Sequence, residues 1–421
     1  MLDNLNTGDP GDRIMARQAV AKVIDGLGST EKLALYVLDR SGLRVVCEFG
    51  TDRDLLMKRV AALNGHAAPY LQPVSQVSDT DSPGQDSGSE QDQFLYPVNA
   101  PEAVLGLPEG FLADSTIRTG FQALGAIADH LAGVPPRKAL IWVSYGVPQM
   151  IKMPPMAART FPNAMPQIQT YGEQADRAVR KLTNADVAVY GVDAAGVWGT
   201  IGSPGATTLD EFASRTGSAS WHGNGLDFEM QTALNDVDHS YTLGYYAPPD
   251  YGDAKFHRIK VEVKRPGVKL RYREGYAMDA PNNSAADRRA KVVQALLSPV
   301  DNSAVPITVK AVRNQNGLSL RLTLDLAGLG LAHNGGRWQG KIEIVARFAA
   351  EDGTESGSPS AKTIEFNLTQ RTYDAALREG LTFTRLLALP PRASKLRVLV
   401  RNDGSGEVGT LSIPLRSVNY D

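Results

Sequence analysis

Short apolar runs that alternate with amphipathic segments constrain the fold of this chain more than any other feature. Lys138–Ser144 and Val187–Asp193 are apolar almost throughout, which is typical of strands buried on both faces of a parallel sheet. Between these two runs, residues 171–182 repeat apolar side chains at helical spacing. This alternation predicts an α/β fold built on a doubly wound, mostly parallel sheet.

The same pattern extends over the first two thirds of the chain. Apolar periodicity predicts further strands at residues 32–39, 43–49 and 240–246, and further helices at 12–27, from 51 onward, 121–131, 209–216 and 228–236. From Phe256 the period changes to two, and Pro266-Gly267 predicts the turn of an antiparallel hairpin. We therefore expect a first domain over residues 1–278 that ends in this β-hairpin.

Residues 66–113 interrupt the alternation. The stretch Ser78–Glu90 is acidic and polar, so it cannot bury enough apolar area to offset the entropy lost on ordering. Its aspartates do not follow the twelve-residue calcium-loop pattern that ends in a bidentate glutamate. These features predict a mobile, solvated insertion.

The last third of the chain has a different organisation. Residues 279–286 resemble a linker in composition, and residues 287–297 are expected to form a short helix. Apolar and polar side chains then alternate over about seven segments separated by turn signals such as Asn316-Gly317. Residues 287–421 are thus predicted to form the short helix and an all-β, immunoglobulin-like sandwich.

Composition excludes several classes of protein. The 421-residue chain has a formal net charge of −2, without the basic excess expected of a nucleic-acid-binding protein. Its longest apolar runs have strand length and are too short to span a bilayer. Cys47 is the single cysteine, so an intrachain disulfide is impossible, and its apolar neighbours predict a buried, unreactive thiol.

Several stretches carry a resemblance to a known family. They are Leu2–Thr7, Gly133–Ser144, Ser240–Tyr246, Phe256–Val261, Tyr272–Tyr276 and Tyr373–Leu381. Together they resemble the von Willebrand factor A-related (VWFA-related) proteins of acidobacteria, over nearly the whole chain. The resemblance implies a von Willebrand A-like first domain and a secreted or cell-envelope, periplasmic location.

The start of the chain departs from that expectation. No basic or apolar signal-peptide region precedes Asp3, which taken literally predicts a cytoplasmic protein. The resemblance implies a hydrophobic central strand leading into the Asp3 loop, and here this strand is nearly absent. We therefore expect a truncated start, and any targeting segment would have been lost with it; a genuine start would predict a cytoplasmic protein.

The resemblance also implies a divalent-cation site at the carboxyl ends of the central strands. The family's first loop has the pattern Asp-x-Ser-x-Ser, and here Asp3 and Thr7 keep their oxygen ligands whereas Leu5 offers none. The second-loop hydroxyl would come from Thr119, with Thr116 as a competitor, just before the helix at Phe121.

The third loop lacks its carboxylate, because Ser144-Tyr145-Gly146 stands where Asp-Gly is expected. Asp193, at the end of the next strand, is a further candidate ligand. One carboxylate and two hydroxyls would hold magnesium only weakly, and no other cofactor is predicted. In the alternative interpretation, Asp3, Asn6 and Thr7 hold the loop by hydrogen bonds.

No enzyme motif stands out. The chain contains no His-Glu-x-x-His pair, no Gly-x-Ser-x-Gly elbow and no phosphate-binding Gly-x-x-x-x-Gly-Lys loop. The sequence therefore predicts a non-enzymatic interaction or adhesion module whose loops around Asp3, Thr119, Ser144 and Asp193 contact an unidentified partner protein. Two alternatives stay open: a hydrolase that pairs Ser144 with His222 in the same crevice, and a structural component of an envelope complex.

Overall fold

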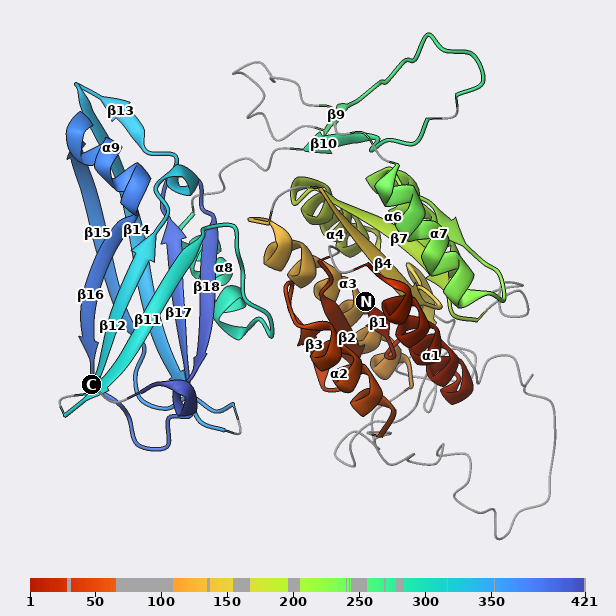
Figure 1. Cartoon of the computed structure of the whole chain (residues 1–421), viewed down its shortest axis with the longest axis horizontal. Coiled ribbons are helices and arrows are strands. Elements are labelled where there is room, and N and C mark those ends of the chain that lie inside the picture. The colour runs from red at the N-terminus through yellow and green to blue at the C-terminus, as the bar shows by residue number, and fades with distance from the viewer. Residues whose placement is uncertain are drawn as a thin grey trace. The chain divides into compact units, whose positions relative to one another are not determined.

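The computed structural model describes residues 1–28, 32–65, 109–134, 137–153, 167–195, 205–239, 241, 243, 256–268, 270–277, 284–315, 317–351 and 353–419. The chain divides into two compact units (Figure 1). The first comprises Met1–Gly125, Arg137–Tyr246 and Phe256–Ala277, and the second comprises Ala126–Pro136, Ala247–Lys255 and Met278–Asp421. Most of the insertion expected at 66–113 and most of the linker expected at 279–286 lie outside the described residues.

The first unit contains a six-stranded mixed sheet with the order β3-β2-β1-β4-β7-β8. β1, β2, β4, β7 and β8 run parallel, and β3 is antiparallel at one edge. The strand bounds are Leu2–Asp3 (β1), Leu35–Asp39 (β2), Gly42–Cys47 (β3), Lys138–Ser144 (β4), Val187–Asp193 (β7) and Ser220–Trp221 (β8). The α/β class predicted from alternating apolar runs is confirmed.

Helices cover both faces of this sheet (Figure 1). Neighbouring residues of a strand point to opposite faces, so each strand contributes side chains to both layers. On one face Trp142 packs edge-on against Phe212, which stacks on Phe121. On the other face Val143 belongs to a buried cluster with Val20. The helices are α1 (Pro10–Gly26), α2 (Arg53–Gly65), α3 (Glu109–Leu131), α4 (Gly172–Asn184), α6 (Ala206–Thr216) and α7 (Leu226–Asp238).

β1 is only two residues long, yet it occupies the centre of the sheet. Leu2 pairs with Val37 on one side and with Val143 on the other, and it is almost fully buried. The amino group of Met1 donates a hydrogen bond to the carbonyl oxygen of Ile141 at 2.6 Å. The short central strand therefore places Asp3 at the carboxyl edge of the sheet.

The hairpin after Phe256 is much shorter than the sequence pattern predicts. Within the described part of this segment, pairing is limited to β9 (Phe256–Arg258) and β10 (Gly275–Ala277), and residues 259–264 are not in a strand. Val263 and Val268 are 47% and 44% exposed, so among the described residues no neighbouring layer covers these two side chains. An alternating pattern alone does not hold two strands together in water. Of the strand predicted at 240–246, only Tyr241 and Leu243 are described, and both are exposed and outside any strand.

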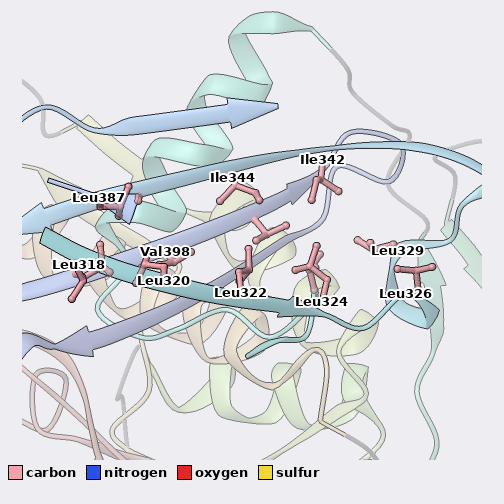
Figure 2. Close-up of a cluster of buried hydrophobic side chains, with 14 of the residues drawn as sticks. Leu318, Leu320, Leu322, Leu324, Leu326, Leu329, Ile342, Ile344, Leu387 and Val398 are labelled. Atoms are coloured by element: carbon pink, nitrogen blue, oxygen red, sulfur yellow. The ribbon is translucent and has the colours of Figure 1, made fainter. Parts of the chain in front are cut away.

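The second unit is built from antiparallel strands, as its alternating sequence predicts. β11 (Ile307–Asn314), β12 (Gly317–Leu324) and β16 (Leu381–Leu387) form one sheet. The other sheet contains β13 (Ala332–Asn334), β14 (Arg337–Ala349), β15 (Ser360–Thr369), β17 (Lys395–Asn402) and β18 (Val408–Pro414). Figure 2 shows that Leu320 and Leu322 of β12 lie in one buried cluster with Ile344 of β14 and Val398 of β17.

Two helices accompany these sheets. α8 (Ala285–Leu297) covers the segment predicted to be helical, and α9 (Gln370–Glu379), which the sequence did not predict, follows β15. Thr369 caps α9 by accepting a hydrogen bond from the amide of Thr372. Among the described residues, no helix combines the length and apolar character needed to cross a bilayer.

Candidate functional site

Polar residues end or directly follow four adjacent strands at the carboxyl edge of the first unit's sheet. β1 ends at Asp3, β4 at Ser144 and β7 at Asp193, while His222 directly follows β8. The strand register pairs Leu2 with Val143, Ser144 with Asp193 and Val192 with Trp221. These residues thus follow one another in strand order, and we call Asp3, Ser144, Asp193 and His222 the polar edge row.

Asp3 is the most completely hydrogen-bonded member of the row. Its Oδ1 accepts from the Asn6 amide at 3.0 Å, and Asn6 Nδ2 donates to both oxygens at 3.1 and 2.9 Å. Its Oδ2 also accepts from Trp142 Nε1 at 3.1 Å and from Ser144 Oγ at 3.0 Å. Burial raises the pKa of the Asp3 carboxyl, and the hydrogen bonds from Asn6, Trp142 and Ser144 counteract part of that rise. Both oxygens already have partners within the protein.

Thr7 closes the loop that begins at Asp3. Its hydroxyl donates to the carbonyl oxygen of Asp3 at 2.7 Å, and Arg13 Nε donates to the carbonyl oxygen of Thr7 at 2.6 Å. Leu5 is buried and contributes no oxygen. Asp3, Asn6 and Thr7 therefore hold the loop by internal hydrogen bonds.

Thr119 lies inside a helix rather than on a loop. α3 begins at Glu109, so the prediction that this helix starts near Phe121 is wrong. The apolar periodicity continues upstream through the buried Ala113 and Ile117, which explains the earlier start. The Thr119 hydroxyl donates to the carbonyl oxygen of Ser115 at 2.8 Å, one helical turn away.

The neighbouring Gly120 comes close to the Asp3 loop. A Cβ atom at Gly120 would lie 3.1 Å from Asn6 Nδ2 and 2.9 Å from Val147 Cγ2. The absence of a side chain there allows the helix to approach the loop closely. Sequence reasoning focused on the hydroxyl of Thr119 and missed this steric role.

The other end of the polar edge row is a histidine held between two carboxylates. His222 Nδ1 lies 3.1 Å from Asp193 Oδ2, and His222 Nε2 lies 2.8 Å from Asp210 Oδ1. Asp193 is fully buried and also accepts a hydrogen bond from the Ala195 amide at 2.9 Å. Burial lowers the pKa of His222, but the hydrogen bonds to Asp210 and Asp193 outweigh it and raise the pKa above its ordinary value. An imidazole with an acceptor on each nitrogen is best satisfied as the imidazolium cation.

Glu229 of α7 is a further buried acid beside the row. It is 5% exposed, and burial together with the negative charge of Asp193 raises the pKa of its carboxyl group. Within the described residues, its Oε2 has no hydrogen-bond partner. A Cβ atom at Gly223 would overlap Glu229 Oε1, so a side chain there would displace this carboxyl from its present position.

Sequence analysis did not single out Glu229, although a signal was present. Leu226, Met230 and Ala233 of α7 are buried and recur at helical spacing. Glu229 lies between them on the same face, so a charged residue occupies a position that the helical pattern assigns to the core.

Ser144 and His222, the nucleophile and base of the hydrolase alternative, each form hydrogen bonds with other groups. Ser144 Oγ donates to Asp3 and accepts from the Gly146 amide at 3.0 Å. Both nitrogens of His222 face Asp193 and Asp210. No hydrogen bond joins the serine to the histidine in the described part of the chain, and no three His, Cys, Asp or Glu side chains there gather as metal ligands would.

Fold and site together define an α/β unit with a polar row at the carboxyl edge of its sheet, followed by an antiparallel β unit. No family model matches the chain, and no curated protein matches it. Among solved structures, the chain is similar to hypothetical protein PH1083 from Pyrococcus horikoshii OT3, with 14% identity and a TM-score of 0.17. The match covers 26% of this chain and 85% of the other, and a score this low does not bear on fold or function.

Proposed function

We propose that this protein is a non-enzymatic interaction or adhesion module of the VWFA-related type, which binds a partner protein through the carboxyl edge of its first unit. The carrying observation is that two buried carboxylates, Asp3 and Asp193, stand at the carboxyl ends of the central strands β1 and β7. Open α/β sheets bind their ligands at this edge. The loops around the polar edge row are therefore the contact surface of the proposal.

A degenerate metal-ion-dependent adhesion site is part of the proposal. Asp3 stands at the end of the central strand, as the family resemblance implies, but its two oxygens accept hydrogen bonds from Asn6, Trp142 and Ser144. A cation would have to displace these donors and would find no carboxylate at Ser144. The proposed module therefore binds its partner without a tightly held metal ion.

Exposed apolar side chains near this edge suit a protein partner. β5 (Met150–Met153) and β6 (Gln167–Thr170) form a hairpin that follows the carboxyl end of β4. Met150 and Ile168 are 59% and 63% exposed. The register places both on the same face of the hairpin, because Met150 pairs with Thr170, two residues from Ile168. Exposed methionine and isoleucine beside polar groups are typical of protein interfaces.

In this proposal the antiparallel β unit is an immunoglobulin-like sandwich that serves as a rigid spacer or a second contact surface. Its alternating inward side chains and two antiparallel sheets support that assignment. The family resemblance further supports a secreted or envelope-associated location.

Site-specific photocrosslinking tests the proposal. A photoreactive residue replaces Ile168 at the carboxyl edge, or Asn184 at the exposed end of α4 as a matched control. We expect one discrete protein adduct from the Ile168 position in cells that produce the protein, and none from the Asn184 position. Equal adducts from both positions, or none from either, would contradict binding through this edge.

Cation dependence is tested on the same protein. Calorimetric titration with magnesium and manganese is expected to show no saturable binding in the micromolar range. Addition of a chelator is expected to leave the crosslinked adduct unchanged. Micromolar binding that Asp3→Ala abolishes would instead establish a working metal site at Asp3.

A further inference from the structure

The second unit has a polar cavity on the outer face of its five-stranded sheet. β14 and β17 direct Ile344 and Val398 into the core cluster, so their alternate side chains point to the other face. α8 covers part of that face, where Ala295 packs with Val345 and Leu399. A cavity of about 230 Å³ lies beside the first turn of α8, and its polar lining consists of Arg288, Lys341, Glu343, Thr363, Arg401 and Asp403.

Arg401 is the buried group of this cavity. It is 6% exposed, and it lies directly across the strand pair from Glu343. Its Nε donates to Glu343 Oε2 at 3.2 Å, and its Nη2 donates to Asp403 Oδ1 at 2.6 Å. Its Nη1 has no acceptor among the described residues. A buried guanidinium N–H without an acceptor lowers the stability of the folded state, so an oxygen atom that accepts a hydrogen bond from Nη1 would be bound favourably.

The charges around the cavity leave a positive excess. Its lining contains three cations, Arg288, Lys341 and Arg401, against the two carboxylates Glu343 and Asp403. Glu343 and Asp403 both lie within 4 Å of a nitrogen of Arg401. Their two negative charges therefore do not balance Arg401 together with the two cations at the rim of the cavity, Arg288 and Lys341.

The two rim cations are available to a ligand from solvent. The side chains of Arg288 and Lys341 are 39% and 46% exposed, whereas that of Arg401 is 7% exposed. Arg288 Nη1 lies 3.6 Å from Asp403 Oδ1, and Lys341 Nζ lies 3.3 Å from Glu365 Oε1, which is not part of the lining. Exposed pairs of this length are weak and can rearrange around an incoming anion.

We propose that this cavity binds a small oxyanion, that is, the carboxylate or phosphate group of a soluble small molecule. Arg401 Nη1 supplies the buried donor, and Arg288 and Lys341 supply the positive charge at the mouth. A guanidinium matches the geometry of carboxylates and phosphates alike. The cavity exceeds the roughly 30 Å³ share of one water molecule several times, so it accommodates a ligand group. The proposal does not depend on the function of the first unit.

Calorimetric titration of the full chain with inorganic phosphate and with malonate at low salt tests this site. We expect saturable binding of one of the two anions, and the anion that binds distinguishes a phosphate from a carboxylate ligand. Arg288→Gln and Lys341→Gln are each expected to weaken binding about tenfold. The matched control Arg289→Gln removes the same charge from the next, exposed residue outside the lining and is expected to change affinity less than about twofold.

A second variant addresses the buried donor itself. Arg401→Lys keeps the positive charge but removes Nη1, so binding is expected to be lost while the thermal unfolding profile shows that the unit remains folded. If Arg401→Lys does not fold, Arg288→Gln and Lys341→Gln still test whether the cavity binds the anion. No saturable binding of either anion, or binding that Arg288→Gln and Lys341→Gln leave unchanged, would overturn the proposal.

Discussion

At the scale of single residues, Asp3 depends on donors from distant parts of the chain. Asn6 belongs to its own loop, whereas Trp142 and Ser144 belong to β4 and lie about 140 residues further along. Sequence analysis predicted the loop hydrogen bonds as one of two interpretations, because Asp, Asn and Thr commonly cap their own loops. It could not predict the Trp142 contact, because nothing in the local pattern indicates which indole faces which carboxylate.

Replacement of Asp3 by alanine removes an acceptor from several buried donors at once. We expect Asp3→Ala to lower the free energy of unfolding by about 3 kcal/mol or more, because each buried donor left unsatisfied costs about 1–3 kcal/mol. Urea unfolding followed by circular dichroism measures this change. Asp9→Ala is the control, since Asp9 is an exposed cap of α1 and its loss costs about 1 kcal/mol. Equal losses for the two variants would show that the buried network around Asp3 contributes little.

The raised pKa of His222 predicts that the free energy of unfolding depends on pH. Its pKa is raised in the folded protein, so the imidazolium contributes stability that is fully present below its ordinary pKa of about 6.5. This contribution is lost as the pH rises through the folded pKa. Unfolding free energies of the wild-type protein and His222→Gln, compared across this range, are expected to converge toward alkaline pH. A difference that stays constant with pH would rule out the raised pKa.

At the scale of elements, the turn after β4 depends on close backbone approach. Gly146 has a φ of +80°, and a Cβ atom there would overlap the carbonyl oxygen of Gly205 at the start of α6. Gly50 has nearly the same φ of +81°, but a Cβ atom there would meet nothing within 4 Å. Alanine substitutions at these two glycines therefore distinguish the cost of backbone strain, which both would carry, from the cost of steric overlap, which only Gly146 would carry.

Gly146→Ala and Gly50→Ala are expected to differ for this reason. Both substitutions carry the strain of a left-handed conformation, which is about 1–2 kcal/mol. Gly146→Ala must also displace the backbone at Gly205, and we expect it to destabilise the protein by about 1–3 kcal/mol more. Chemical denaturation of both variants measures the difference, and similar values would indicate that the turn moves freely.

Elements were predictable from the sequence where most of their positions are apolar and at least partly buried. β4 and β7 have the predicted bounds because strands buried on both faces are apolar at nearly every position. The prediction of a long hairpin after Phe256 failed because Val263 and Val268 have no covering layer among the described residues, which only the tertiary structure reveals. α9 lacked a predictive signal because its one fully buried residue is Ala376, so no apolar stripe marks it.

At the scale of the whole molecule, the two units have separate apolar cores. One buried cluster is centred on residues such as Leu2 and Val143, and another on residues such as Leu322 and Ile344. We expect two calorimetric unfolding transitions that respond to different substitutions. Leu322→Ala is expected to destabilise the second unit by about 2–5 kcal/mol, and Asp3→Ala to shift only the other transition. A single transition that both variants shift alike would contradict independent cores.

The edge strand β15 has a consequence for the behaviour of the protein in concentrated solution. β15 pairs with β14, and along it Lys362, Thr363 and Glu365 are exposed. A second molecule that extended the sheet at this edge would have to remove these charged side chains from water. The charges on β15 therefore act against fibril growth and precipitation through this edge, and they favour a well-dispersed protein during high-concentration titrations.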